Sequence, residues 1–191
     1  MKTNKAAIFC TALAILPIVG LLLAAKSPRE AHAAQVARGK YLVEFGTCGD
    51  CHTPHKLTPN GPVPDEQRLL SGHPETAKLP SPPTLPAGPW VAVTVGDTAW
   101  SGPWGISYSA NLTPDRETGL GIWTEEMFVK TMRTGRHMGE GRRVLPPMPW
   151  EGLSKLNDAD LKAIYAYLRS IPPVKNHVPD PVSPAGSASF Q

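Results

Sequence analysis

Hydrophobic and polar residues follow a helical period most clearly near the end of the chain, in "NDADLKAIYAYLRSIPPV" (157–174). Leu161, Ile164, Tyr165 and Leu168 fall at positions i, i+3, i+4 and i+7, so one face of a helix would be apolar. Asn157 is a good N-cap and a pair of prolines stops the pattern. This segment is predicted to form the C-terminal helix.

Two further segments favour helices. In residues 33–48 the apolar residues have a spread that fits a helix, and Gly46 is the expected stop. Gly39 lies inside this pattern at a cost in helix propensity, which indicates close approach of another backbone. In residues 124–135, Thr124 is the expected N-cap and Gly135 the C-terminal stop.

Residues 53–123 have no long hydrophobic period and are rich in Pro, Gly, Ser and Thr. Within them, residues 90–100 are consistent with a short β hairpin whose turn lies near Gly96 and Asp97. The chain has 22 Pro and 17 Gly in 191 residues. Such a loop-rich domain buries a modest core and usually needs a covalent staple or a cofactor to hold it.

Residues 1–33 have the form of an export signal. Lys2 and Lys5 precede an apolar run at 6–25, and "AHA" (31–33) resembles a cleavage site. The run is also long enough to span a bilayer as a helix. Cleavage after Ala33 and an uncleaved N-terminal anchor therefore both remain open, and either would place the rest of the chain outside the cytoplasm.

Charge argues against a nucleic-acid-binding surface. The net charge is +3. Residues 1–33 contain four basic residues and one acidic residue, and thus account for 4 − 1 = +3 of it. The remaining chain is close to neutral, whereas nucleic-acid binding needs clustered positive charge along one face.

The most informative motif is "CGDCH", which contains Cys48, Cys51 and His52. A disulfide over so short a loop would stabilise little. A thioredoxin-like pair needs a βαβ surround, and a zinc site needs a second ligand pair, and neither is visible. Cys-x-x-Cys-His is the attachment pattern of haem c, in which the histidine binds the iron. We therefore expect one covalent haem c, held through both thiols.

Met148 is the candidate for the second axial position of the iron. It lies in "LPPMPW" (145–150), where prolines on both sides hold the chain extended, and it follows His52 by about a hundred residues. Met127 and Met132 fall in a predicted helix, where core packing is the usual role, and Met138 lies in a polar stretch. His137 is the rival ligand.

The other histidines are weaker candidates. His55 is too close to His52 in the chain to reach the opposite face of the haem. His73 and His177 lie in proline-flanked loops and are expected to be solvated, and His32 falls in the leader.

The chain resembles class I c-type cytochromes over about residues 34–175. The resemblance rests on "CGDCH", on "WGISYSANLTPDRETGLGIWTEEMFVKTMRTGRH" (104–137), on "LPPMPW" and on "LKAIYAYLRSIPPV". The second of these is similar to domains in the cytochrome subunits of membrane-bound alcohol and gluconate dehydrogenases and in their single-haem relatives. Those subunits carry three attachment motifs, and this chain has one.

The resemblance implies a mostly α fold of the class I cytochrome c type with a long loop-rich insertion. The cytochrome domain would span residues 34–178, with a disordered tail at 179–191. The N- and C-terminal helices would cross near Gly39 and Tyr165. The resemblance also implies that Trp104, Tyr108 and Asn111 line the haem or its propionates, although an aromatic pair in such a loop can equally cover the core.

The resulting hypothesis is a periplasmic electron carrier and not an enzyme. If protein side chains fill both axial positions, the iron changes oxidation state and binds no substrate. The expected partners are redox proteins: a dehydrogenase, an oxidase or another cytochrome. The alternatives are a peroxidase-like haem enzyme or a haem-based sensor with a labile sixth ligand.

The arginines before Met148 bear on both hypotheses. Arg136, Arg142 and Arg143, with His137, form the candidate cluster for a haem enzyme. Together with Arg133 they could instead steer an acidic partner to the haem edge, or form a solvated basic face.

Overall fold

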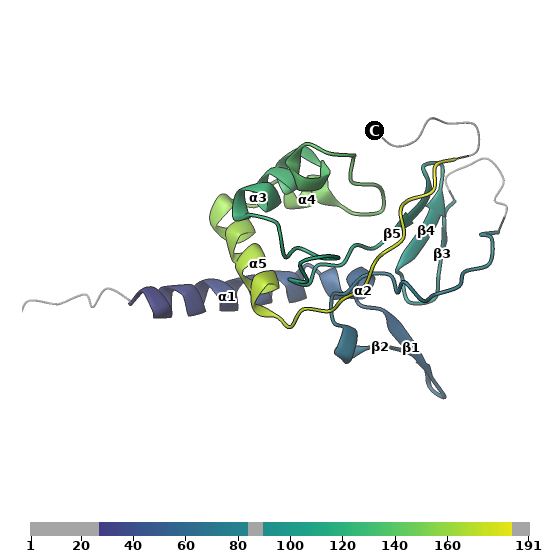
Figure 1. Ribbon diagram of the computed structural model, residues 1–191, viewed down its shortest axis with the longest axis horizontal. Helices are drawn as coiled ribbons and strands as arrows, with labels where there is room; N and C mark the ends of the chain where they lie inside the picture. Colours follow the sequence, from purple (N-terminus) through teal and green to yellow (C-terminus); the bar gives the residue numbers. More distant parts are fainter. Residues whose placement is uncertain (1–26, 84–89, 185–191) are drawn as a thin grey trace, which may run out of the picture.

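The structure is a computed structural model that describes residues 27–83 and 90–184. Figure 1 shows the order of its elements along the chain. The helices are α1 (Pro28–Phe45), α2 (Cys48–His52), α3 (Glu125–Thr134), α4 (Trp150–Leu153) and α5 (Asp158–Ser170). The strands are β1 (His55–Thr58), β2 (Gly61–Pro64), β3 (Ala92–Val93), β4 (Ala99–Gly102) and β5 (Gly105–Tyr108), and two short 3₁₀ turns lie at Glu66–Arg68 and His137–Gly139.

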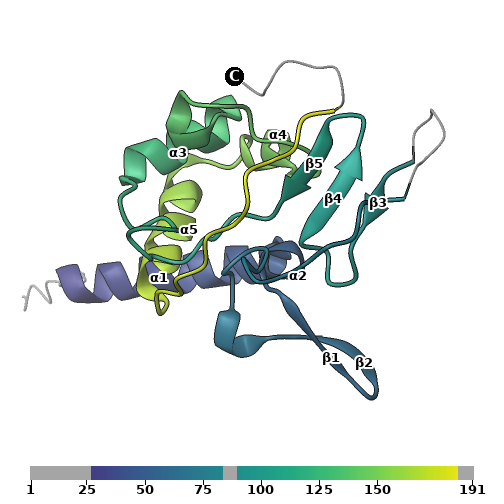
Figure 2. The same cartoon turned by 45° about the vertical axis from the view of Figure 1, so that its right-hand side comes forward.

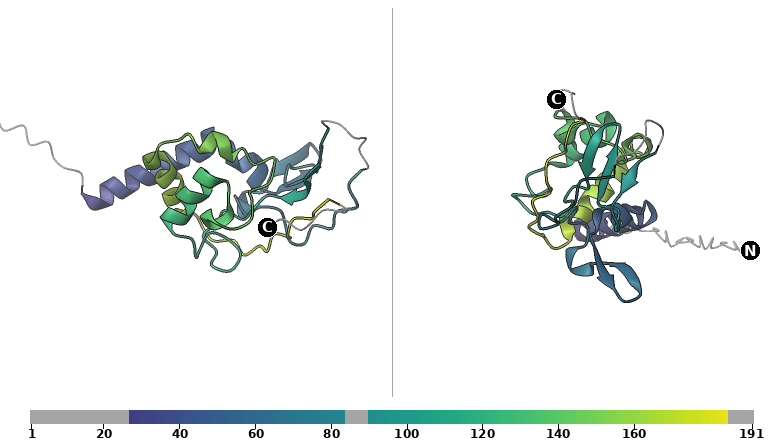
Figure 3. Two further views of the ribbon diagram at one scale, coloured as in Figure 1. Left: turned by 90° about the horizontal axis from the view of Figure 1, so that it is seen from above. Right: turned by 90° about the vertical axis from the view of Figure 1, so that its right-hand side faces the viewer.

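Helix α1 begins earlier than the sequence pattern indicated. The Ser27 hydroxyl accepts from the backbone N–H of Glu30 and the Glu30 side chain accepts from Ser27, which is a complete capping box. The helix ends before Gly46, as predicted. Residues 27–34 are all exposed, and this first part of α1 projects beyond the rest of the domain (Figures 1 and 3).

The crossing of α1 and α5 is the main contact between helices. A Cβ on Gly39 would lie 1.8 Å from the carbonyl oxygen of Ala163 and 2.9 Å from Cβ of Tyr167. The prediction that Gly39 permits close approach is confirmed. The crossing lies near Tyr165, as expected, with its contacts at the residues two positions before and after it. The Tyr165 ring itself packs against Phe128 of α3 and donates its hydroxyl to the Trp123 carbonyl at 2.6 Å. Residues 163 and 167 share one helix face, and 165 lies on another.

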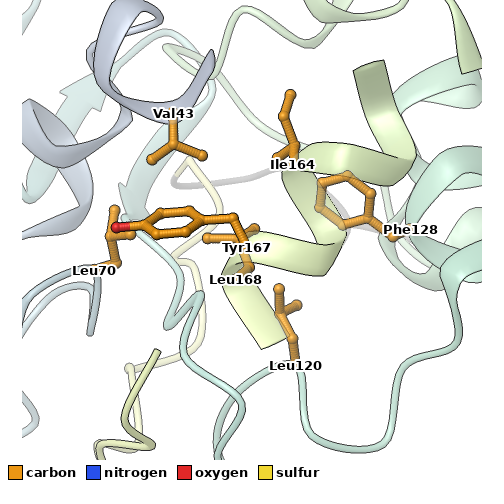
Figure 4. Close-up of a cluster of buried hydrophobic side chains, with 7 residues drawn as sticks. All are labelled: Val43, Leu70, Leu120, Phe128, Ile164, Tyr167 and Leu168. Carbon is orange, nitrogen blue, oxygen red and sulfur yellow. The ribbon is translucent and has the colours of Figure 1, made fainter. Parts of the chain in front are cut away.

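The other two predicted helices are confirmed with their caps. Thr124 accepts from the Met127 N–H at the start of α3, and Gly135 ends it in the left-handed conformation. Asn157 accepts from the Asp160 N–H at the start of α5. These helices and α1 enclose a core of apolar side chains, shown in Figure 4, that consists of Val43, Leu70, Leu120, Phe128, Ile164, Tyr167 and Leu168.

The segment 53–123 contains more regular structure than its composition suggested. The predicted hairpin is present, since β3 pairs antiparallel with β4 around Gly96 and Asp97. β4 also pairs antiparallel with β5, which gives a three-stranded sheet in the order β3-β4-β5. A second hairpin, β1–β2, projects from the body of the domain (Figures 2 and 3). The fold is mostly α, as expected, and its two small antiparallel sheets exceed the single hairpin predicted.

The chain after α5 crosses the domain and reaches β5 (Figure 1). Val182 and Ile106 exchange two backbone hydrogen bonds, of 2.8 and 2.9 Å. Residues 179–184, which the sequence assigned to a disordered tail, therefore have a defined place beside the sheet, because β5 offers an open strand edge. Residues 185–191 lie outside the described residues.

The predicted leader lies largely outside the described residues. Its apolar run, 6–25, precedes Ser27, and Ala33 lies within α1. No helix among residues 27–83 and 90–184 is long and apolar enough to cross a membrane.

Candidate haem-binding site

The Cys-x-x-Cys-His motif folds into the short helix α2, directly after α1. Cys48 and Cys51 are three positions apart on this helix and both are free, partly buried thiols. Burial is the main cause that raises the pKa of both thiols, and the nearby charge of Asp50 adds to it. Reactive redox cysteines have a lowered pKa, so the two thiols differ from them in the direction of the shift.

His52 is held in one orientation by a single hydrogen bond. Its side chain is buried, and Nδ1 lies 2.8 Å from the carbonyl oxygen of Ala110. Because a carbonyl only accepts, Nδ1 carries the proton and Nε2 keeps its lone pair. Burial lowers the pKa of His52, which favours the neutral ring. A neutral imidazole whose other nitrogen donates to a carbonyl is the arrangement of metal-binding histidines.

A buried network of polar groups begins at Asn111, the residue after Ala110. The Asn111 amide donates to the Val174 carbonyl at 2.8 Å, and its oxygen accepts from the N–H and hydroxyl of Thr113. Asn176 donates to the carbonyls of Ser71 and His73, at 2.7 and 2.9 Å, and accepts from the Glu75 N–H. The resemblance implies that Asn111 lines the haem or its propionates. The structure places its amide in this network, next to the residue that orients His52.

Met148 lies in a second loop, which we call the methionine loop (residues 144–150). Its side chain is half-buried. The Ser107 hydroxyl donates to the Pro146 carbonyl at 2.6 Å, and Trp104 Nε1 donates to the same hydroxyl at 3.1 Å. After Met148, the ring of Trp150 lies against Gly135, where a Cβ would meet it at 2.4 Å. Trp104, assigned from sequence to the haem, thus supports the methionine loop.

Tyr108 lies on the other face of β5 from Ser107, because side chains alternate along a strand. Its ring centroid is 4.9 Å from that of His73, and it borders a cavity of about 330 Å³ against residues 79–83. His73 is buried, with Nδ1 2.9 Å from the Thr98 hydroxyl. The prediction that His73 is solvated is wrong, because β4 and β5 cover it.

The remaining candidate ligands have other partners. His137 is exposed, and its ring lies edge-on to Trp123 with centroids 4.9 Å apart. His55 Nδ1 lies 3.2 Å from the Gly96 carbonyl, and Met132 packs against the core. His177 is exposed, as predicted. Among the described residues no three His, Cys, Asp or Glu side chains cluster as metal ligands, so the zinc interpretation gains no support.

The arginines before Met148 are only partly free of partners. Arg133 donates to Asp158 at 2.5 Å and to the Ser154 carbonyl. Arg136 and Arg142 donate to carbonyls of their own loop, and residues 136 and 143 face each other in an antiparallel bridge. Within the described part of the chain, Arg136, Arg142 and Arg143 form no ion pair with an acidic side chain.

A sequence model of the family described as "Cytochrome c" matches residues 36–172. The chain belongs to the cytochrome c family. This membership implies covalent haem c and a role in electron transfer. The donor set fits that cofactor: two free thiols on one short helix, and a histidine whose Nε2 keeps its lone pair.

Three relatives indicate which branch of the family the chain is similar to. A nicotinate dehydrogenase subunit of Pseudomonas putida is 33% identical over 147 residues, which are 77% of this chain and 9% of the relative. The fructose dehydrogenase cytochrome subunit of Gluconobacter japonicus is 31% identical over 163 residues, 82% of this chain and 26% of the relative. The alcohol dehydrogenase (quinone) cytochrome c subunit of Gluconobacter oxydans is 28% identical over 170 residues, 87% of this chain and 28% of the relative. The chain thus spans less than a third of the length of each of these relatives.

Proposed function

We propose that this protein is a single-haem c-type cytochrome that carries one electron at a time to or from a dehydrogenase. The observation that carries the proposal is the bond between His52 Nδ1 and the Ala110 carbonyl, beside two free thiols. That bond fixes both the tautomer and the direction of the ring before any ligand is bound. The family match supports electron transfer, and the relatives support the dehydrogenase.

Four side chains would hold the haem. Cys48 and Cys51 would attach it, His52 would bind the iron through Nε2, and Met148 would bind it through the thioether. The haem supplies an iron that accepts and donates a single electron. With His52 and Met148 both bound to it, the iron would be closed to substrate and water. The choice of Met148 would also raise the reduction potential, because a thioether favours the ferrous state relative to a second imidazole.

We infer one haem per chain from the motif count. The sequence contains one Cys-x-x-Cys-His, and the third cysteine, Cys10, lies in the apolar run 6–25. The relatives named as dehydrogenase cytochrome subunits are about three times as long as this chain. The matched parts are 82% and 87% of this chain but only 26% and 28% of the relatives. We therefore propose that this chain acts as one haem-carrying unit, either as a separate carrier or as a small subunit beside a dehydrogenase.

The place of action that we propose is the periplasm. Haem c is attached outside the cytoplasm, and residues 1–33 have the charge and hydrophobicity of an export signal. The run at 6–25 would either be removed with the signal or hold the domain at the outer face of the inner membrane.

The test is the visible spectrum of the protein made together with haem-maturation machinery, with its iron content per chain. We expect one iron per chain, a low-spin spectrum in both oxidation states, and haem that stays with the chain after denaturation. Haem that acid acetone extracts would contradict covalent attachment. Ready binding of carbon monoxide by the ferrous protein would favour an enzyme or a sensor over a carrier.

A further inference from the structure

The methionine loop can make few hydrogen bonds of its own. Pro146, Pro147 and Pro149 have no N–H, and the N–H of Met148 reaches only Leu145 within the loop, at 3.3 Å. Pro146 and Pro147 are also exposed, so packing constrains them little. Carbonyls at the end of the loop accept from N–H groups of α4, which follows it directly. Among the described residues, the bond from Ser107 is the hydrogen bond that reaches residues 146–149 from a distant part of the chain.

Ser107 is well placed to hold this loop. It is only 6% exposed. Its hydroxyl accepts from Trp104 Nε1, so its single hydrogen is directed to the Pro146 carbonyl. Trp104 in turn lies across Gly102, where a Cβ would meet its ring at 2.6 Å. The chain Trp104–Ser107–Pro146 is therefore a directed pair of hydrogen bonds in which each strengthens the other.

The segment that carries β5 also positions His52, through a residue just after the strand ends. Ala110, whose carbonyl orients His52, follows Ser107 by three residues. β5 is paired with β4 along one edge and with Val182 along the other. Because both of its edges are hydrogen-bonded, β5 holds Ser107, and Ala110 just after it, in fixed positions. These two residues contact the methionine loop and His52.

We propose that Ser107 is a positioning residue for Met148 and acts through the Pro146 carbonyl. This inference rests on the proposed function, because it requires Met148 to bind the iron. Removal of the hydroxyl leaves the carbonyl and Trp104 Nε1 unpaired and frees the loop to move away. The thioether then competes less well with an external ligand for the iron.

The test uses the ferric holoprotein and two readouts: the weak far-red absorption of a sulfur-to-iron bond, and the affinity for cyanide. In Ser107→Ala we expect a weaker far-red band and a cyanide affinity raised about tenfold, which is the size expected for one lost buried hydrogen bond. Ser101→Ala is the matched control. Ser101 is in the neighbouring strand on the opposite face, against the cavity, and its variant should match the wild type.

Trp104→Phe tests the same chain of bonds without touching the serine. It removes the donor to Ser107 and keeps an aromatic ring, so we expect about a threefold rise in cyanide affinity, because one net hydrogen bond is weakened and none of the loop contacts is removed. If Ser107→Ala fails to accumulate as holoprotein, this variant decides, and a wild-type cyanide affinity in it overturns the inference.

The outcomes separate the inference from the function on which it rests. If the wild type shows the far-red band, Met148→Ala loses it and Ser107→Ala equals Ser101→Ala, then Ser107 has no positioning role and ligation by Met148 stands. If Ser107→Ala only unfolds more easily, with the band and the cyanide affinity unchanged, its role is structural and the inference is overturned. A wild type without the band overturns both proposals.

Discussion

The two sides of the candidate site are built in different ways. On the attachment side, His52 is buried, its ring is hydrogen-bonded to the Ala110 carbonyl, and its own carbonyl accepts from the Gly72 N–H. On the other side, the methionine loop is half exposed and rich in proline, and one hydrogen bond from β5 reaches its proline run. The difference fits the chemistry of the proposed ligands. One side would hold the haem permanently, and the other would supply a soft ligand that a stronger external ligand can displace.

The largest effect is expected when both cysteines of the attachment side are removed. In Cys48→Ala combined with Cys51→Ala, we expect no covalent haem and no stable fold. The loop-rich chain has a small apolar core, which does not offset its backbone entropy without the cofactor. Thermal unfolding followed by circular dichroism should show no cooperative transition. A sharp transition in the variant would show that the core is sufficient alone.

An added methyl group should destabilise the crossing of α1 and α5, next to the attachment side, far more than it destabilises α4, which follows the methionine loop. Gly39→Ala forces a Cβ against the Ala163 carbonyl, which should lower the free energy of unfolding by about 2 kcal/mol or more. Gly152→Ala in α4 is the matched change on the other side. Among the described residues, and apart from its chain neighbours and the backbone of its own helix, nothing lies within 4 Å of its added Cβ, so the stability should stay the same or rise slightly. Urea unfolding of both holoproteins would measure the contrast, and equal losses would contradict it.

The smallest effect on stability is expected at an exposed ion pair between α1 and α5. The Arg38 guanidinium donates to both carboxylate oxygens of Asp160, at 2.8 and 3.1 Å. The hydrogen bond from Arg38 is the main cause that lowers the pKa of Asp160. Since the folded-state pKa is below the unfolded one, the pair stabilises the fold above the unfolded pKa, and this contribution is lost as pH falls through the folded pKa.

The Arg38→Gln variant tests this linkage. We expect a small loss of stability at neutral pH that disappears in acid, measured by urea unfolding over a pH series. Lys155→Gln is the charge-matched control, because Lys155 is exposed and forms no ion pair among the described residues. A loss of stability that is the same at every pH would place the Arg38 effect in packing instead.

The sequence predicts the parts of the site that depend on neighbours in the chain. The attachment motif, the caps at Thr124 and Asn157, and the close approach at Gly39 are local signals, and the structure confirms the three helices. The family match supports haem c on this motif. The turn at Gly96 and Asp97 is also local and is confirmed.

Long-range contacts explain what the sequence does not predict. The bond from His52 to Ala110 joins residues 58 positions apart, and the bond from Asn176 to Ser71 joins residues 105 apart. The burial of His73 depends on Thr98, just before β4, and on Tyr108 in β5, which are 25 or more positions further along the chain. The resemblance implies only that segment 53–123 is a loop-rich insertion, whereas the structure shows that it carries the carbonyl that orients His52. A pairing partner so far along the chain leaves no pattern that a single sequence reveals.

The central claim is that the chain itself would fill both axial positions of the iron, with His52 on the attachment side and Met148 from the methionine loop. The most direct measurement is the far-red absorption of the ferric protein in the wild type, in Met148→Ala and in Met138→Ala. We expect a band in the wild type and in Met138→Ala, and its loss in Met148→Ala together with a lower reduction potential. A band lost in Met138→Ala and kept in Met148→Ala would contradict the claim, as would a spectrum that only His137→Ala changes.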